Sequence, residues 1–178
     1  MNPRLVRDTH LGSIWEGTTN VVQLDVLRAM IRTEAHRVLF AHIGEVTARL
    51  VERDDTRPIR GLATFLEASR QRLEARCTAV LESPRPRQEA AMHRLAPALF
   101  DLFAGVCLAD EASFQLTSQG SARKLIVASL HAALRLGPAV PDPLEDPEIL
   151  ALIERLERWV WMPPDGVPDL GEARLAPT

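Results

Sequence analysis

The amino-acid sequence predicts an all-α protein, a helical bundle, on three observations. Apolar residues recur at spacings of three and four along most of the chain, which is the pattern of helices with one buried face. Glycines and prolines divide the chain into blocks of typical helix length. No stretch alternates apolar and polar residues for long enough to predict a strand.

The first predicted helix follows Thr18, Thr19 and Asn20, whose side chains can cap the free N–H groups at its start. It runs without interruption to about Leu50, where the charged residues 52–55 end it. Its apolar residues, which mostly fit one broad face, are Val22, Leu24, Val26, Leu27, Met30, Ile31, Val38, Leu39, Ile43, Val46 and Leu50.

Thr56 and Pro58 open the second predicted helix, because a hydroxyl cap followed by a proline with fixed φ suits a first helical turn. Its apolar residues continue to Val80. Pro84 and Pro86 then end the block.

A long third block covers residues 87–117 and contains Pro97, so we predict either a kinked helix or two helices that meet at the proline. Residues 118–121, Ser-Gln-Gly-Ser, have the composition of a C-cap followed by an N-cap. A short, mostly apolar and buried helix is expected over 122–136. A last helix, with acidic residues in its first turn, is expected over 146–161.

Composition excludes several classes of protein. The chain has 178 residues, 46% hydrophobic and 25% charged, with a formal net charge of −3. Disorder does not fit this apolar share, and no apolar run approaches the roughly 18 residues of a membrane span. Without a signal segment at its start, we expect a cytoplasmic protein with no membrane partner. Cys77 and Cys107 lie at helical apolar positions and predict two buried thiols. Neither they nor the five histidines have metal-ligand spacing, so no metal is expected.

Residues 13–20, Ser-Ile-Trp-Glu-Gly-Thr-Thr-Asn, are the segment most suited to chemistry. Glu16 lies beside Trp15 on a predicted loop, where desolvation would raise its pKa toward that of a useful proton acceptor. Gly17 allows a ligand close to the backbone, and the helix start that follows offers free N–H groups to an anion or a polar cofactor edge. The same spacing also fits an exposed loop acid before a threonine cap.

The sequence from Ile14 to Asn20, together with Arg-Asp at 7–8 and Leu-Asp-Val-Leu-Arg at 24–28, resembles the C-terminal signature of the acyl-CoA dehydrogenases. Trp15, in place of the commoner tyrosine, and the Leu-Asp-Val-Leu-Arg continuation are most similar to the adaptive-response (AidB-like) branch. The downstream helices agree with that branch only in helical character and approximate length.

The resemblance implies a flavin-dependent α,β-dehydrogenation of an acyl-CoA thioester. Glu16 would take the α-proton while the β-hydrogen passes as hydride to FAD. The backbone N–H of Glu16 and a flavin ribityl hydroxyl would stabilise the enolate oxygen. Gly17, Thr18 and Asn20 match cofactor-binding positions. Trp15 would line the substrate or flavin pocket, although a role as a core anchor fits it equally well.

Family members place a helical domain, a β-domain and the first helices of the C-terminal bundle before this loop. We therefore expect this chain to be a C-terminal piece of a dehydrogenase, or a gene product trimmed to it, that neither retains FAD nor oxidises acyl-CoA in isolation. Residues 1–50 would end the dehydrogenase C-terminal domain, 51–162 would form an additional helical region, and 163–178 would be an irregular tail.

Two other functions stay open. One is a helical module that binds DNA, with Arg28 and Arg32 one turn apart as candidate phosphate contacts. Interleaved acids dilute that basic surface, and no groove-reading motif is visible. The other is assembly into a homo-oligomer through an apolar helical face.

Overall fold

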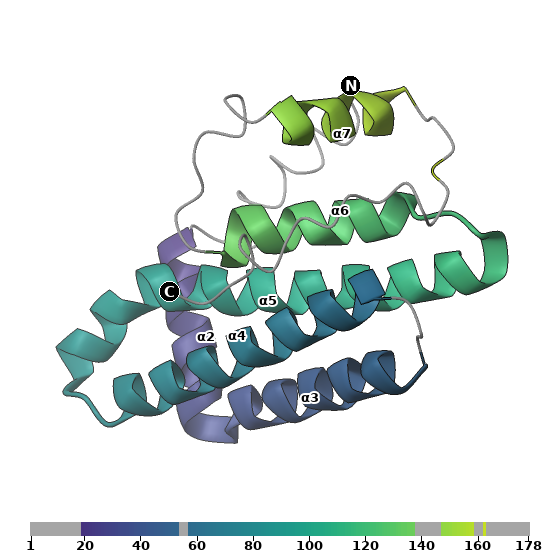
Figure 1. Cartoon of the computed structure of the whole chain (residues 1–178). Helices are drawn as coiled ribbons and strands as arrows, with labels where there is room; N and C mark the ends of the chain where they lie inside the picture. Colours follow the sequence, from purple (N-terminus) through teal and green to yellow (C-terminus); the bar gives the residue numbers. More distant parts are fainter. Residues whose placement is uncertain (1–18, 54–56, 138–146, 159–161, 163–178) are drawn as a thin grey trace.

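Figure 1 shows the computed structural model of the chain, which describes residues 19–53, 57–137, 147–158 and 162. All regular structure in these residues is helical, which confirms the predicted all-α bundle. Four helices, α3 to α6, lie in successive layers, while α2 crosses them steeply and α7 covers α6 (Figure 1). None of the described helices has both the length and the apolar character needed to cross a lipid bilayer.

The first predicted helix is two helices, α2 (Thr19–Thr33) and α3 (Ala35–Arg53), so the prediction of one continuous helix is wrong. The break is at Glu34, which has a φ of 51° in the left-handed region. Its reason is the position of the buried residues. Leu27 and Ile43 are both fully buried, yet sixteen residues of straight helix at about 100° each would turn them about 160° apart. The bend lets both face one core.

The next two helices, α4 (Arg57–Leu81) and α5 (Arg85–Gln119), form an antiparallel hairpin in the centre of the bundle. Gln88, in the first turn of α5, binds carbonyl groups at the end of α4. Its Nε2 donates hydrogen bonds to the carbonyl oxygens of Leu81 and Ser83 at 2.9 and 3.0 Å.

α5 is one helix of 35 residues that continues through Pro97, which settles the choice between one helix and two. Pro84 is its N-cap residue, so α5 begins at Arg85, two residues before the predicted start at 87, and Pro86 lies in its first turn. Gly120 ends it with a φ of 61°, and its N–H donates to the carbonyl oxygen of Leu116 at 3.0 Å. The predicted glycine C-cap is confirmed.

The buried helix predicted at 122–136 is α6 (Arg123–His131) followed by a π-helical turn, η1 (Ala132–Leu136). Ala122 is the N-cap residue of α6. Ser121, the predicted cap, lies one residue earlier, and its Oγ accepts the backbone N–H of Arg123 at 3.5 Å. Gln115 of α5 adds a second contact, because its Oε1 accepts the backbone N–H of Lys124 at 3.0 Å.

The last helix, α7 (Pro147–Glu157), is shorter at its C-terminal end than the predicted 146–161. The described residues form two apolar cores. The larger joins α2 to α6, and its biggest fully buried side chains are Leu27, Phe40, Ile43, Leu50, Ile59, Leu62, Leu66, Met92, Leu95, Leu102 and Leu125. The smaller joins α6 to α7 and consists of Ile126, Leu130, Ile149, Leu152 and Met162. The larger core runs without a break across the boundary expected after residue 50.

The two cysteines differ in environment. Cys77 on α4 is fully buried, as predicted, and burial raises the pKa of its thiol to about 11. Cys107 on α5 is exposed, so the prediction of a second buried thiol is wrong. Its position follows the helical period of α5, which turns Val106 into the core and Cys107 toward solvent.

Candidate functional site

The loop predicted to carry chemistry lies almost entirely outside the described residues, which begin at Thr19. Trp15, Glu16, Gly17 and Thr18 are therefore not placed. Asn20 is placed, in the first turn of α2 with an exposed side chain. That turn contains no acidic residue.

The two arginines proposed as phosphate contacts lie on the exposed surface of α2. Arg28 forms an ion pair with Asp25 one turn earlier, and both side chains are more than half exposed. Arg32 lies in the last turn of α2, where a positive charge complements the helix dipole. Arg28 thus already has a carboxylate partner, which a nucleic-acid phosphate would have to displace.

A polar cluster that sequence reasoning did not single out joins α3 to α4. Arg70 donates from Nε and Nη2 to the two carboxylate oxygens of Glu67 at 2.9 and 2.7 Å, and from Nη1 to Glu74 at 2.6 Å. Thr47 of α3 donates to Glu67 Oε2 at 3.1 Å. Glu67 therefore accepts bonds from two helices, which fixes their register.

The electrostatics of this cluster suit structure better than proton transfer. The hydrogen bond from Arg70 holds the pKa of Glu67 below its ordinary value, although burial opposes the shift. The same bond raises the pKa of Arg70. Glu67 stays ionised near neutral pH and is a weak base, because a lowered pKa reduces proton affinity.

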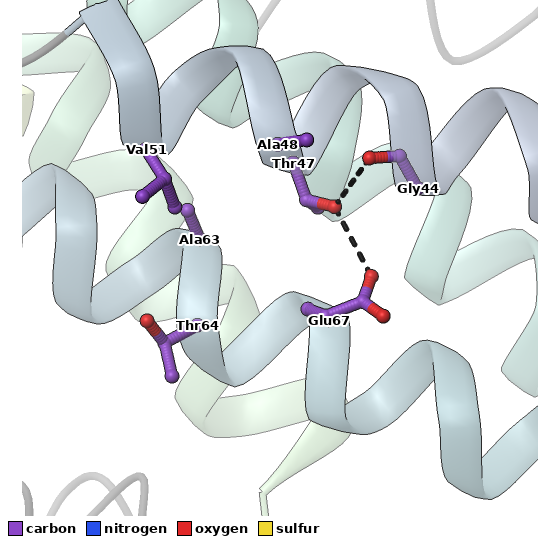
Figure 2. Close-up of a pocket in the computed structure, with 7 residues that line it drawn as sticks. All are labelled: Gly44, Thr47, Ala48, Val51, Ala63, Thr64 and Glu67. Atoms are coloured by element: carbon purple, nitrogen blue, oxygen red, sulfur yellow. Dashed lines mark hydrogen bonds between the residues drawn. The ribbon is translucent and has the colours of Figure 1, made fainter.

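A shallow pocket of about 290 Å³ lies next to Glu67 between α3 and α4 (Figure 2). Its walls are mostly small side chains, and Thr47 and Glu67 point toward each other at one end (Figure 2). Its lining residues are Gly44, Thr47, Ala48, Val51, Ala63, Thr64 and Glu67. Since Arg70 already neutralises Glu67, the pocket offers a ligand little unpaired charge.

A second cluster joins α5 to α6 and η1. His131 Nε2 lies 2.8 Å from the backbone carbonyl oxygen of Asp101, and Arg135 Nε donates to Asp101 Oδ1 at 3.2 Å. Asp101 is buried, and its charge partner is Arg135 in the π-helical turn. The contacts of His131 and Arg135 therefore hold the end of α6 and η1 against α5. No group of three potential ligands suitable for a metal ion occurs among the described residues, including these.

An exposed apolar row on α5 is the third feature. Phe100 and Phe114 are 69% and 70% exposed, Phe103 is 38% exposed, and Cys107 is exposed between them. We call these four residues the α5 stripe. Aromatic side chains this open are unusual for a surface that faces only water. The sequence did contain a signal for the stripe, since these residues fall outside the leucine periodicity that identifies the buried face of α5.

Comparison of the chain with protein-family models, with curated proteins and with solved structures finds no match.

Proposed function

We propose that this chain is the C-terminal portion of a cytoplasmic, flavin-dependent acyl-CoA dehydrogenase-like oxidoreductase, and that it is inactive as an isolated chain. The observation that supports the proposal is the motif from Ile14 to Asn20, together with the start of α2 at Thr19, within the last two residues of that motif. The Glu-Gly-Thr segment therefore leads into a helix start with no acidic side chain in its first turn.

In the proposed reaction Glu16 accepts the α-proton of an acyl-CoA thioester, and its backbone N–H donates to the thioester oxygen as negative charge develops there. A bound FAD would supply the acceptor for the β-hydrogen, which leaves as hydride. Gly17 would permit close approach of the cofactor, while Thr18 and Asn20 would offer polar contacts to it. Trp15 would line the substrate or flavin pocket.

The proposed inactivity of the isolated chain follows from the same chemistry. An α-proton becomes acidic enough for a carboxylate only when the enolate oxygen is stabilised and the hydride has an acceptor. In this proposal, residues of other domains supply the remaining cofactor contacts and pocket walls. The purified chain should therefore be colourless, without a flavin absorbance band. It should not reduce an electron-accepting dye with isovaleryl-CoA.

A chimera tests the assignment directly. Residues 1–50 would replace the matching segment of an acyl-CoA dehydrogenase of known activity, and flavin content and dye reduction would be measured. We expect a yellow chimera whose activity falls about 10²- to 10⁴-fold in Glu16→Gln with flavin retained. Glu45→Gln, at an exposed position of α3, is the matched control and should change little. A yellow chimera that Glu16→Gln leaves fully active would overturn the proposal.

A second proposed role is assembly into a homo-oligomer, and the observation that favours it is the exposed α5 stripe. A purified chain that stays monomeric at tens of micromolar in light scattering would count against it. The DNA-binding alternative has no comparable support among the described residues, because Arg28 is paired with Asp25 and Arg70 lies between two glutamates.

A further inference from the structure

We propose that two copies of this chain pair through the α5 stripe, with their α5 helices antiparallel and Cys107 at the two-fold axis. This inference rests on the assembly role proposed above and deepens it by naming the surface and the orientation. It is independent of the flavin-enzyme assignment.

The first argument is the spacing of the stripe. Phe100, Cys107 and Phe114 are seven residues apart, which is close to two turns of helix, so they lie in one line about 21 Å long. Phe103 widens this line on the side of α3, where its ring lies 6.5 Å from that of His42. A row of this kind is the seam along which two helices pack.

The second argument is symmetry. Phe100 and Phe114 are equally distant from Cys107 along the helix. A two-fold axis through Cys107 that reverses the helix direction therefore sets Phe100 of one copy against Phe114 of the other, twice. Closed homodimers use self-complementary surfaces of this kind, in which residue i meets j and j meets i.

The third argument is charge, and it selects the antiparallel orientation. Residues 85–99 of α5 contain three arginines and one glutamate, whereas residues 101–119 contain three acids and no arginine or lysine. Antiparallel pairing about Cys107 sets Asp110 and Glu111 of each copy level with the uncharged Ala104 and Phe103 of the other. Parallel pairing would instead set Asp110 and Glu111 of the two copies at one level, where like charges repel.

The borders of the stripe also suit an interface. Asp110 pairs with Arg49 of α3 at 3.4 Å on one side, and Glu111 pairs with Lys124 of α6 on the other. These charged side chains are held by partners within the same copy, so they form a polar rim around the apolar line. Inside this rim, Phe100 and Phe114 are 69% and 70% exposed, and the second copy would cover them.

Sedimentation equilibrium of the full chain from 1 to 100 µM, under reducing conditions, provides the test. We expect a dimer for the wild type. Phe100→Lys and Phe114→Glu, tested singly, should each weaken dimerisation at least tenfold while the circular dichroism of the helices is unchanged. Val51→Lys, which introduces the same charge on the pocket side of α3, is the matched control and should leave the dimer intact.

The double variant Phe100→Lys with Phe114→Glu tests the orientation. Antiparallel pairing brings each lysine against a glutamate, so the double variant should dimerise at least as tightly as either single variant. Parallel pairing brings like charges together, and a double variant that dimerises more weakly than both would overturn the antiparallel arrangement.

Cross-linking tests the position of the axis. A short bis-maleimide should join two wild-type chains through Cys107, and Cys107→Ala should abolish the product. Phe100→Lys should suppress the cross-link while a monofunctional maleimide still labels it. A wild-type monomer at 100 µM would overturn both this pairing and the assembly role. A dimer that neither single substitution weakens would overturn the α5 pairing alone.

Discussion

Arg70 holds both carboxylate oxygens of Glu67, through hydrogen bonds of 2.9 and 2.7 Å, three residues apart on α4. The pair is partly buried, since the side chains of Arg70 and Glu67 are 18% and 31% exposed. Thr47 brings α3 to the same carboxylate. A two-bond contact with a guanidinium is both stronger and more directional than a single neutral hydrogen bond. Glu67 is therefore the place where the contact between α3 and α4 can be tested.

Replacing Glu67 with glutamine should lower the free energy of unfolding by about 1 kcal/mol at pH 7, because charge-assisted bonds become neutral ones. Urea unfolding followed by circular dichroism measures the change. The matched control is Glu89→Gln, which removes the exposed ion pair with Arg85 and should cost less than about 0.5 kcal/mol. Equal losses in the two variants would contradict the role of the Glu67 contact.

The difference in the free energy of unfolding between wild type and Glu67→Gln should shrink as the pH falls. The hydrogen bond from Arg70 lowers the pKa of Glu67 below 4.5, so the folded chain favours the ionised carboxylate more than the unfolded chain does. The contribution is complete above pH 4.5 and is lost as the pH falls through the folded-state pKa. Unfolding curves measured from pH 7 down to pH 3 should converge for the two proteins, and a constant difference would argue against this linkage.

Gly120→Ala should destabilise the chain by about 1 kcal/mol, because Gly120 has a φ of 61° at the end of α5 and a Cβ is strained there. Gly61→Ala is the contrasting variant. Gly61 lies within α4, and beyond the local backbone of that helix nothing lies within 4 Å of an added Cβ, so alanine should stabilise the chain by about 0.5 to 1 kcal/mol. Thermal or urea unfolding of both variants checks the opposite signs.

Gly105→Ala should destabilise the chain by about 1 to 2 kcal/mol through overpacking. An added Cβ on α5 would lie 3.2 Å from Leu66 Cδ2 of α4 and 3.3 Å from His131 Cδ2 of α6. Leu66 is fully buried, and His131 is bound to the Asp101 carbonyl oxygen, so neither side chain moves away freely. Gly105→Val should cost more than Gly105→Ala in urea unfolding, and the reverse order would mean that this contact has room to relax.

At concentrations below dimerisation, a maleimide should modify one cysteine per folded chain, and that cysteine is Cys107. Cys77 is fully buried with a thiol pKa of about 11, so its reactive thiolate is scarce and inaccessible. Burial and the nearby Glu111 and Asp110 also raise the pKa of Cys107, so its labelling should accelerate as the pH rises. Mass spectrometry of native and urea-unfolded chains should show one and two adducts. Cys107→Ser should show none when folded.

Much of the bundle was predictable because its signals are local. Gly120 predicted the end of α5, and the spacing of the leucines predicted its buried face. Both signals depend only on residues within one or two helical turns. The break at Glu34 was not predictable in this way. Its cause is the relative orientation of two buried faces in the folded core, which a single broad apolar pattern conceals.

The candidate sites show the same difference between local signals and signals that depend on the folded core. Glu16 and its neighbours are recognisable from a contiguous motif, whereas Thr47 and Glu67 come together only when α3 packs on α4. The α5 stripe is intermediate. Phe100 and Phe114 are two heptads apart in the sequence, but their exposure follows from which side of α5 the other helices cover.

The small core between α6 and α7 gives the molecule a second, weaker cooperative unit. Besides its apolar side chains, hydrogen bonds between described residues link it to the start of α6, among them Ala122 N–H to Met162 O at 2.8 Å and Arg123 Nη2 to Leu156 O at 2.7 Å. α7 can therefore open while the larger core stays closed. In native-state hydrogen exchange, the amides of α7 should lose protection through this local opening, whereas those of α4 and the centre of α5 exchange only when the whole chain unfolds.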